Sequence, residues 1–591
     1  MPVDAPTHPG GFDQARYLRT QGIKAMLHIT SYTPLAPGFK NPIKQVGYAI
    51  KARLKTLHER SLPRPYSDLL IGLVFGQHGT KLPDAWTDNF QKTGLTHLLV
   101  VSGSQVALLS GICFNLLFKF PMGIRVLLIG IINSVFYIMT GGGASIFRAI
   151  IMMMLTLCLR WASHRTTPMH IMGVTLGIMG LINPLSWFQT GAQLSFLATM
   201  SLVFGVPKVA SFFPNTRPFI AQLIGLTLAP FLFTSALLWY IFGQISVGSL
   251  LTNLLVGFWI EWLVVIGFFS TIIGMILPVI TDWINYGCLG MMMLLTGLVN
   301  TVSQWPGMVI SLGKPALLVP IIAYLVMAYG ISRPVIWRMT TTLALISFCF
   351  GLWFPSLWLT HPLRVFFLDV GQGDSILIQT PNNHTILIDT GPPGSGRYVI
   401  GPSLRYLGIT AIDRVILTHP HADHTGGFKT LARQFSIGTV LHDQNRDYYQ
   451  VYAFNDGVQL RVIYPPRTDE NINNVSVSAL LTYGDIRFAF TGDLERAGER
   501  KLIERYGDTL QATVLKLGHH GSQTSSIPDF LDTVRPAIAV ATVGERNRYR
   551  HPSPEPVAAC AARGIKLYRT DHHGTVAFRT DGTDLYSRTW K

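Results

Sequence analysis

Hydrophobic and polar positions divide this chain into two parts of different character. Between about His97 and Leu359, apolar residues run in stretches long enough to cross a bilayer, separated by Gly, Pro and short polar loops. The stretch Leu69–Phe75 is too short to span, and we interpret it as an interfacial helix. The pattern predicts a polytopic α-helical membrane domain of about ten spans, over residues 97–118, 123–140, 145–162, 168–187, 189–206, 219–242, 247–277, 283–303, 315–332 and 339–359.

After about Pro362 the pattern changes to short β-like runs that end in Gly turns, and charges of both signs become frequent. By contrast, no Asp or Glu lies between Asp88 and Glu261. The sequence therefore predicts a polar, basic region over residues 1–65, a membrane domain over 66–360 and a globular domain over 361–591.

The positive charge of the chain lies almost wholly in its first part. The 591 residues carry a formal net charge of +16; residues 1–360 contain 22 Lys and Arg against 8 Asp and Glu, and residues 361–591 contain 25 against 23. Such a basic part suits a polyanion or an anionic membrane face. The alternative is loop charge that only sets the membrane topology.

The orientation in the membrane follows from where the basic residues fall. Four pairs of basic residues flank the first, third, fifth and ninth loops between the predicted spans, at Lys119 and Arg125, Arg160 and Arg165, Lys208 and Arg217, and Arg333 and Arg338. The positive-inside rule makes these loops cytoplasmic. Ten crossings then leave both the N-terminal segment and the C-terminal domain outside.

Two charged residues, Arg148 and Glu261, lie inside apolar stretches. Charges at membrane depth are costly unless they face a cavity or a partner, so the bundle is predicted to be a conduit. Arg148 follows the small-residue run Gly141–Ser145, which permits a broken helix and a close backbone approach. The alternative is that both side chains reach the membrane interface.

The segment Thr418–Gly427 holds the strongest chemical signal. It contains His419, His421, Asp423 and His424 and follows the β-like run Arg414–Leu417. A strand that ends in a tight loop can aim several side chains at one point, and this set supplies ligands for two cations. Two divalent cations lower the pKa of a bridging water and hold the oxygens of a phosphodiester, and Asp423 is the expected orienting base.

Further candidate ligands follow other predicted strands. Asp493 follows the run Ile486–Phe490 and is expected to bridge both cations. His519 and His520 follow Val514–Leu517, just before Ser522. Asp389 also ends a strand and is expected to orient the ligand loop from outside.

This combination resembles the metallo-β-lactamase fold, which implies an αββα sandwich with the metals at the edge between two sheets. The resemblance implies that His419 and His421 hold one metal, that Asp423, His424 and His519 hold the other, and that Asp493 is shared. His520, with Ser522 beside it, is expected to be a proton donor or phosphate contact, although the order of His519 and His520 stays open. His442 is either the further ligand that the fold usually supplies for the first metal or an ordinary loop residue.

The membrane part adds a second resemblance. Lys92–Val106, Gly191–Leu197 and Ser249–Leu255 are similar to motifs of the channel domain of the ComEC competence family. In the second part, Asp369–Ser375, His519–Ser522, Asn547–Pro552 and Tyr568–Asp571 are similar to that family's version of the hydrolase. His97 and Gln105 lie in the first motif and are candidates for the channel wall, with core packing as the alternative.

The competence resemblance implies a multi-pass protein of the bacterial inner membrane that contacts membrane lipids. It implies that transforming DNA enters as single-stranded DNA, and that an extracytoplasmic nuclease domain degrades the strand left outside. It also implies an external DNA-delivery protein, and a cytoplasmic DNA motor and single-strand-binding proteins, as partners. Residues 1–65 resemble only the tail of an extracytoplasmic OB-like region and a basic linker, so the chain is expected to lack the N-terminal part of the family pattern.

Two other functions remain open at this point. The chain could be a membrane-anchored phosphodiesterase or esterase for a wall or lipid substrate, although ten spans are far more than an anchor requires. It could also be a transporter whose hydrolase domain only binds DNA. The mixed His and carboxylate ligands accept either Mn or Zn.

Overall fold

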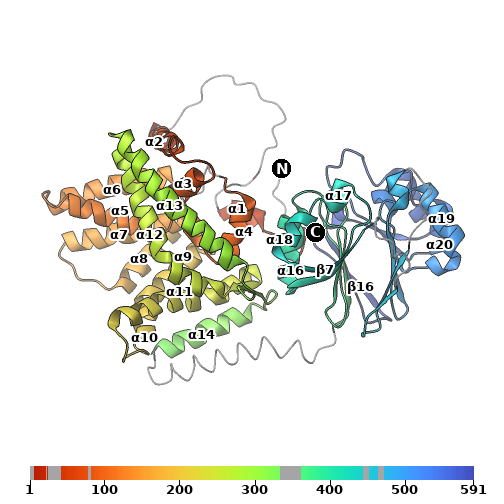
Figure 1. Cartoon of the computed structure of the whole chain (residues 1–591). Helices are drawn as coiled ribbons and strands as arrows, with labels where there is room; N and C mark the ends of the chain where they lie inside the picture. The colour runs from red at the N-terminus through yellow and green to blue at the C-terminus, as the bar shows by residue number, and fades with distance from the viewer. Residues whose placement is uncertain are drawn as a thin grey trace.

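We describe the protein from a computed structural model, which describes residues 5–20, 23, 25, 42–76, 81–332, 361–442, 451–463 and 471–591. A helical part, up to residue 332, lies beside a two-sheet domain that begins at residue 361 (Figure 1). The helical part is on the left of Figure 1 and the two-sheet domain on the right.

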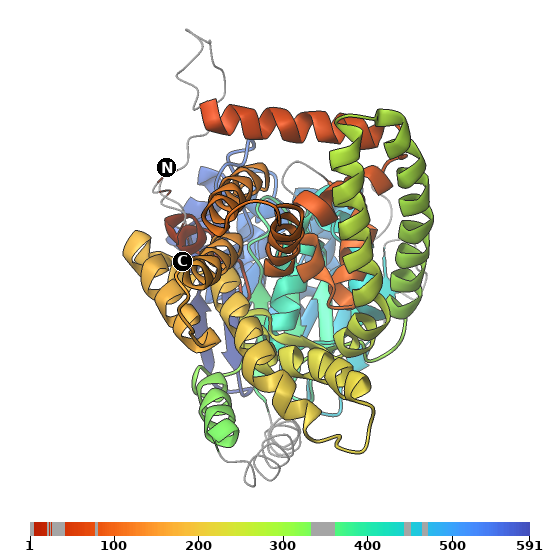
Figure 2. The ribbon, with the colours of Figure 1, turned by 90° about the vertical axis from the view of Figure 1, so that its left-hand side faces the viewer.

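The helical part is a bundle in which most helices coincide with apolar stretches of the sequence. Its α-helices are α1 (Gln14–Thr20), α2 (Pro42–Glu59), α3 (Tyr66–Phe75), α4 (Asp84–Lys92), α5 (Gly103–Leu116), α6 (Met122–Met139), α7 (Ala144–Trp161), α8 (Pro168–Ile182), α9 (Thr190–Met200), α10 (Val206–Ala210), α11 (Pro218–Phe242), α12 (Gly248–Gly274), α13 (Pro278–Ser303) and α14 (Leu318–Ser332). Figure 2 shows the bundle with the two-sheet domain behind it.

Helices fall on every described stretch that the sequence predicts to be a span. Five are long and apolar enough to cross a membrane, namely α6, α7, α9 with α10, α11 and α13, and the two bent halves of α12 make a sixth if taken as one span. The helices α5, α8 and α14 are shorter. The predicted count of about ten is therefore not confirmed, and the expected span 339–359 lies outside the described residues.

The apolar surface of these helices points outward, as it does in proteins that lie in lipid. Between 22% and 33% of each of the five long apolar windows is buried. Four large apolar side chains in or next to these helices are at least 75% exposed, namely Leu181, Phe219, Ile276 and Trp283. So much exposed apolar surface is unfavourable in water and suits a protein that lies in a membrane.

The interpretation of Leu69–Phe75 as an interfacial helix is wrong. The stretch forms α3, and Leu69, Leu70 and Leu73 have no exposed surface. A Cβ on Gly267 of α12 would lie 2.9 Å from side-chain atoms of both Leu70 and Val74, so the two helices are in close contact. A helix that is apolar on all sides packs within a bundle, because an interface needs one polar face.

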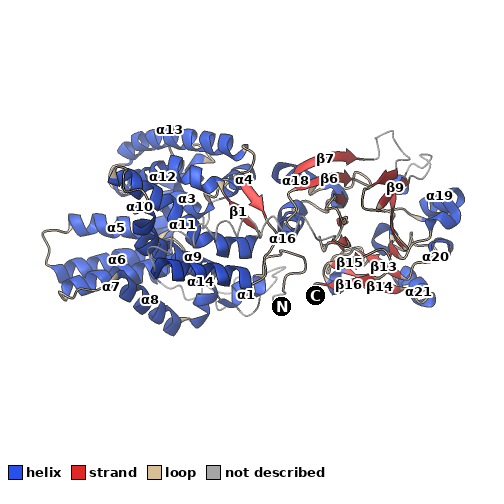
Figure 3. Cartoon of the chain, turned by 90° about the horizontal axis from the view of Figure 1, so that it is seen from below, coloured by secondary structure: helices blue, strands red, loops and turns tan. Residues whose placement is uncertain are grey.

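The C-terminal domain contains two seven-stranded sheets that pack face to face (Figure 3). The first has the order β16–β15–β3–β4–β5–β6–β7, and the second β14–β13–β12–β11–β10–β9–β8. The first is formed by β3 (Leu363–Phe367), β4 (Ile376–Gln379), β5 (Thr385–Ile388), β6 (Ala411–Ile416), β7 (Ser436–Leu441), β15 (Val576–Thr580) and β16 (Leu585–Thr589). The second is formed by β8 (Val451–Ala453), β9 (Gln459–Ile463), β10 (Ser478–Tyr483), β11 (Ile486–Phe490), β12 (Val514–Lys516), β13 (Ile538–Ala541) and β14 (Lys566–Arg569).

Side chains that alternate along the strands fill the space between the sheets. Phe367 and Phe578 from the first sheet meet Phe488 and Phe490 from the second, with ring centroids about 6 Å apart. Separate apolar clusters cover the outer face of each sheet. The helices of the domain are α16 (Gly401–Leu407), α17 (Ala422–Thr425), α18 (Phe428–Gln434), α19 (Arg496–Tyr506), α20 (Pro528–Val534), α21 (Pro554–Ala562) and α22 (Thr570–His573). This is the sandwich of sheets and outer helices that the sequence predicts.

The two parts are joined by specific contacts. The Arg397 guanidinium lies 2.6 Å from Asp84 and 3.3 Å from Asp88, both on α4. The backbone N–H of Lys314 donates to the carbonyl of Tyr406 at 3.0 Å. The link Lys314–Tyr406 lies close to a small sheet of β1 (Gln244–Ser246) and β2 (Val309–Ser311), which ties helix ends of the bundle together.

Candidate metal centre

Four strand ends bring the candidate ligands to one edge of the two-sheet domain. In the first sheet, β5 and β6 are parallel neighbours, and Asp389 and the loop Thr418–His421 follow their ends. In the second, β11 and β12 are parallel neighbours, and Asp493 and the turn at His519 and His520 follow them. The carboxyl ends of parallel neighbours share one edge of a sheet. Stacking the two sheets therefore gathers side chains as far apart in sequence as Asp389 and His520.

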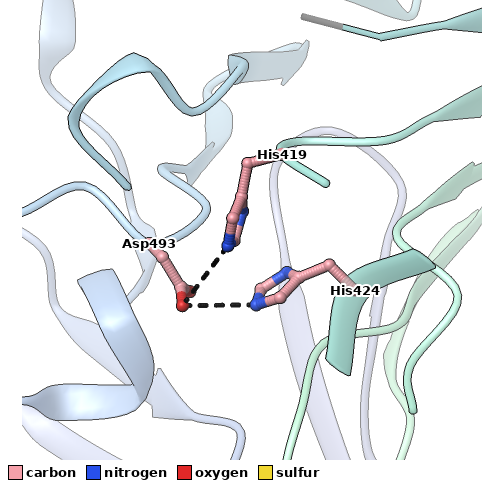
Figure 4. A group of neighbouring side chains, drawn as sticks. All are labelled: His419, His424 and Asp493. Carbon is pink, nitrogen blue, oxygen red and sulfur yellow. Dashed lines mark ion pairs between the residues drawn. The ribbon is translucent and has the colours of Figure 1, made fainter. Parts of the chain in front are cut away.

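One oxygen, Oδ2 of Asp493, lies within 4 Å of four imidazoles, those of His419, His424, His519 and His520. It lies 3.3 Å from Nε2 of His424 and 3.9 Å from Nε2 of His419 (Figure 4). Nε2 of His520 is 3.6 Å away. Asp423 approaches from the other side, with Oδ2 3.5 Å from Nε2 of His520 and 3.9 Å from Nε2 of His424. Four ligands of one tetrahedral cation lie about 3.4 Å apart when each is about 2.1 Å from it. The spacing suits a cation among Asp423, His424, Asp493 and His520.

His419 and His421 form the other end of the cluster. Nε2 of His419 lies 3.0 Å from Nδ1 of His421, too close for two nitrogens that share neither a proton nor a cation. His419 is buried and His421 is exposed, so this end opens to solvent. The groups whose ligand atoms all lie within 4.8 Å of one another are His419–His424–Asp493, Asp423–His424–His520, Asp374–Asp389–His424 and Asp374–Asp493–His520.

Of the two adjacent histidines, His520 is the one inside these groups. His519 places Nε2 3.8 Å from Asp493 and Nδ1 3.2 Å from Glu495, and it belongs to none of the four groups. Both residues have positive φ, 45° and 56°, which side chains other than Gly rarely adopt. Such strained backbone persists where the surrounding structure requires it, often at functional sites.

Two other predicted site residues lie beside the cluster rather than in it. His442 directly follows β7 and is half-buried, outside the four groups. The Ser522 hydroxyl is hydrogen bonded to the Thr524 hydroxyl at 3.0 Å and accepts from its backbone N–H. The roles of His442 and Ser522 stay predictions.

Asp389 orients the ligand loop through three hydrogen bonds. Nδ1 of His424 donates to Oδ2 of Asp389 at 2.7 Å. The backbone N–H and the hydroxyl of Thr418 donate to the same carboxylate at 2.8 and 2.7 Å. With Nδ1 engaged in this way, Nε2 of His424 is the nitrogen presented to the cluster.

Sequence reasoning missed two buried charged residues of the centre, Asp374 and Lys516. The Lys516 ammonium makes an ion pair with Asp374, lies 3.4 Å from Oδ1 of Asp493 and donates to the carbonyl of Gly492 at 2.7 Å. Asp374 also accepts from the Thr542 hydroxyl and lies 3.3 Å from Nδ1 of His520. Asp374 ends the Gly-Gln-Gly-Asp turn that the sequence shows, but Lys516 lies within an apolar strand and gives no comparable signal.

The electrostatics of the centre favour cations. Burial lowers the pKa of His424, but the charges of Asp493 and Asp389 outweigh it and hold that pKa well above its usual value. His520 behaves in the same way: burial lowers its pKa, yet Asp493 and Asp374 raise it to about 9. For His419, burial and the charge of His424 lower the pKa to about 3, so its ring is neutral and free to act as a ligand.

The residues present fit a divalent cation. Nε2 of His424 and Nε2 of His520 are buried and have no hydrogen-bond partner among the described residues, although each lies beside two carboxylates. Buried polar atoms are almost always satisfied, so two orphaned nitrogens facing the same oxygens need an explanation. A cation bound between them satisfies both nitrogens and both carboxylates.

The predicted channel residues lie in different surroundings. Arg148 is buried in the bundle, and His97 is exposed and donates to the carbonyl of Gly94 at 3.0 Å. Gln105 uses its amide to join two helices: it accepts from the backbone N–H of Ser102 at 2.9 Å and donates to the carbonyl of Leu73 at 2.6 Å. Glu261 lies exposed on α12.

Comparisons with known proteins match both parts of the chain. Residues 73–360 match the family model described as Competence protein, and residues 368–477 match that of the metallo-β-lactamase superfamily. ComE operon protein 3 of Bacillus subtilis (strain 168) is 25% identical over 647 residues, which cover 98% of this chain and 80% of that protein. Competence protein ComA of Neisseria gonorrhoeae is 28% identical over 86% of this chain and 74% of its own length. Recombination protein 2 of Haemophilus influenzae is 24% identical over 92% of this chain and 74% of its own length.

Proposed function

The chain belongs to the competence-protein family and carries a metallo-β-lactamase superfamily domain, and from this premise we propose that it takes up DNA across the bacterial inner membrane. The DNA passes the helical bundle as a single strand, and the C-terminal domain cleaves the strand that stays outside. The observation that carries this proposal is the cluster around Asp493, whose His and Asp side chains are spaced to hold a cation, on a domain docked to the bundle.

We propose that the centre holds two divalent cations, Mn or Zn. One is held by Asp423, His424, Asp493 and His520, and the other by His419 and His421 with Asp493 shared, while His442 remains a candidate for the second. When bound, such a pair supplies an activated water and neutralises charge on a phosphodiester. This assignment gives His520 the ligand position for which the sequence favours His519.

The protein's own residues prepare the centre for a phosphodiester. Asp389 holds the ring of His424, and Lys516 holds Oδ1 of Asp493 so that Oδ2 faces the imidazoles. Asp423 is about one-third exposed and lies on the solvent side, where it can orient a water molecule. His519 stands at the rim beside Glu495 and is placed to contact a phosphate or donate a proton.

A basic and aromatic loop borders the same rim. Tyr549 is 55% exposed, its ring stacks on His551 at 5.8 Å, and the Arg548 guanidinium lies 5.2 Å from the Tyr549 ring. The ring of His551 lies 5.7 Å from that of His519. Exposed aromatic rings beside arginines bind single-stranded nucleic acid by stacking and phosphate contact.

The helix ends support a hydrolase domain on the extracytoplasmic side. The contacts of Asp84 with Arg397 and of Lys314 with Tyr406 fall at one end of the bundle. The loops after α5, α7 and α10 lie one helix length away from the docked end. They contain Lys119, Arg165 and Arg217, and Arg160 lies in the last turn of α7, whereas Lys314 lies at the docked end itself. The positive-inside rule then makes the far end of the bundle cytoplasmic and the docked end extracytoplasmic. A DNA-delivery protein outside, and a DNA motor and single-strand-binding proteins inside, are the partners we propose.

Cleavage and uptake of DNA by matched variants test the proposal. Purified full-length protein is given single-stranded or duplex DNA with Mn²⁺, with Zn²⁺ or with chelator, and cells carrying the same variants are scored for transformation. We expect cation-dependent cleavage that Asp493→Ala abolishes and Asp532→Ala, on exposed α20, leaves unchanged. Cleavage of a small phosphodiester but not of DNA favours the membrane-anchored phosphodiesterase instead. Full transformation with Asp493→Ala shows that the domain only binds DNA.

A further inference from the structure

Arg148 is a buried cation in the helical part that lacks an anion. Its side chain is 5% exposed, and its Nη1 donates to the Thr199 hydroxyl and approaches the sulfur of Met152 at 3.5 Å. The ring of Phe196 lies 5.5 Å away. Nε is buried and has no hydrogen-bond partner within the part of the chain that the structure describes. A guanidinium carries five N–H donors and strongly prefers a carboxylate or phosphate, so this environment leaves it under-satisfied.

No carboxylate of the bundle can supply the missing charge. Residues 42–332 contain 16 Lys and Arg but only six carboxylates, all of them described, at Glu59, Asp68, Asp84, Asp88, Glu261 and Asp282. Five of them lie within 4.0 Å of Arg60, Arg64 or Arg397. Glu261 is exposed on α12. Among the described residues, Arg148 therefore forms no ion pair.

The guanidinium faces the start of α5. A Cβ placed on Gly103, the first residue of that helix, would lie 3.1 Å from Nη2 of Arg148. The first N–H groups of a helix have no partner within it, and the helix dipole adds positive potential there. The hydroxyls of Ser102 and Ser104, 2.7 Å apart, lie at the same end. A buried cation and a helix N-terminus thus meet where the glycine leaves room.

We propose that Arg148 and the N-terminus of α5 form an oxyanion site for a backbone phosphate of single-stranded DNA. The combination of helix N–H groups and arginine is a recurrent way to bind phosphate. Lipid headgroups also carry phosphate, but Arg148 is buried among α5, α7 and α9, away from the apolar outer surface. The DNA assignment rests on the proposed function, because it requires a nucleic acid inside the bundle.

The position of the site suits cargo that comes from the side of the hydrolase domain. The Lys92 ammonium donates to the carbonyl of Arg433 in that domain at 2.6 Å. The chain then runs from Lys92 through His97 to Gly103, so one short segment contacts the hydrolase domain at its start and Arg148 at its end. Arg148 itself lies in the second turn of α7.

Binding of a fluorescent oligothymidylate to the full-length protein tests this site. The protein is placed in phosphatidylcholine nanodiscs with chelator, and binding is followed by anisotropy over a range of salt concentrations. We expect Arg148→Gln to weaken binding about tenfold and to reduce the slope of log affinity against log salt by about 0.7, the value for one phosphate contact on a single strand. Arg160→Gln, on the exposed far end of the same helix, changes neither quantity.

Two further measurements keep the test decisive. Gly103→Ala retains the charge but places a methyl group against Nη2, and we expect several-fold weaker binding even if Arg148→Gln fails to fold. A methylphosphonate oligothymidylate, which has a neutral backbone, should bind the wild type and Arg148→Gln equally. Unchanged affinity and salt slope in both variants overturn the site.

The remaining outcomes separate this site from its alternatives. If added phosphatidylglycerol abolishes the difference between the wild type and Arg148→Gln, the ligand is a lipid phosphate and the DNA assignment is overturned. If the wild type binds no oligothymidylate at all, the proposed uptake function fails with it. If the wild type binds the oligothymidylate and Arg148→Gln binds it equally well, only the phosphate site at Arg148 is contradicted.

Discussion

Nδ1 of His424 donates to Oδ2 of Asp389 at 2.7 Å, and Nε2 of the same ring lies 3.3 Å from Oδ2 of Asp493. One imidazole thereby joins a strand end of the first sheet to a strand end of the second. The centre depends on this link, because Asp423 and His424 follow a strand of the first sheet, whereas Asp493 and His520 follow strands of the second.

Asp389→Asn should weaken cation binding without removing a ligand. The amide cannot accept all three hydrogen bonds from Thr418 and His424, so the imidazole loses its fixed orientation. Loss of such an outer carboxylate typically lowers metal affinity about 10- to 100-fold. Titration calorimetry with Mn²⁺ or Zn²⁺ measures the change, and Asp532→Asn is the matched control. Equal affinity of Asp389→Asn and the wild type would contradict the orienting role.

Lys516→Met should destabilise the cation-free protein far more than the cation-loaded one. Without the ammonium, Asp374 and Asp493 are buried carboxylates that face each other, and breaking such a buried pair costs about 3–5 kcal/mol. Bound divalent cations replace much of the missing positive charge. Chemical unfolding with and without Mn²⁺ gives both free energies, and Lys566→Met at exposed β14 is the control. The same loss in both states would show that Lys516 only packs.

Tyr549→Ala should weaken binding of single-stranded DNA about tenfold, since one stacked base contributes about 1–3 kcal/mol. Binding of duplex DNA should change little, because its paired bases cannot reach the ring. Tyr586→Ala removes an equally exposed ring on β16 and is the control. Anisotropy titrations with the two kinds of DNA measure the effect. A loss that is the same for both kinds would indicate a general electrostatic contact.

The titration of Glu499 should lower the free energy of unfolding as the pH rises from about 4.5 to about 7. Burial raises the pKa of Glu499 to about 7 from its usual 4.5, although the N–H groups of Ile527 and Ser526 donate to it. Between these values the folded protein holds a proton that the unfolded chain has lost, so a higher pH favours unfolding. Above about pH 7 this contribution is constant.

Urea unfolding across this pH range, with wild type and Glu499→Gln compared, isolates the effect from that of other groups. The free energy of unfolding of the variant should lose this part of the pH dependence. Glu504→Gln, exposed on the same helix, should keep it. A pH profile of Glu499→Gln that parallels the wild type would show that the carboxyl titrates near its usual value.

Much of this organisation could be read from local patterns. Apolar runs predicted helices on every described stretch from residue 97 onward, because a helix in lipid must be apolar along its length. The cluster from His419 to His424 was readable because its side chains share one loop, whose geometry follows from the strand before it. The strands before Asp493 and His519 were also placed correctly.

The number of spans could not be read in the same way. The stretches 97–118 and 168–187 are continuous in composition, yet α5 ends after 14 residues and α8 after 15. Composition shows that a stretch is apolar but does not show how long its helix is. The sequence of Leu69–Phe75 is compatible with a helix at the membrane interface or with one inside the bundle. Only its contact with α12 shows that it is buried.

The sequence by itself determined that this chain joins an apolar helical bundle to a domain with a histidine and aspartate centre. Only the tertiary structure decided that His520 lies in the ligand groups, whereas His519 lies beside Glu495. It also revealed Lys516 between Asp374 and Asp493, and Arg148 against Gly103. These pairings join residues about 23 to 140 positions apart, and packing, which no local pattern encodes, brings them together.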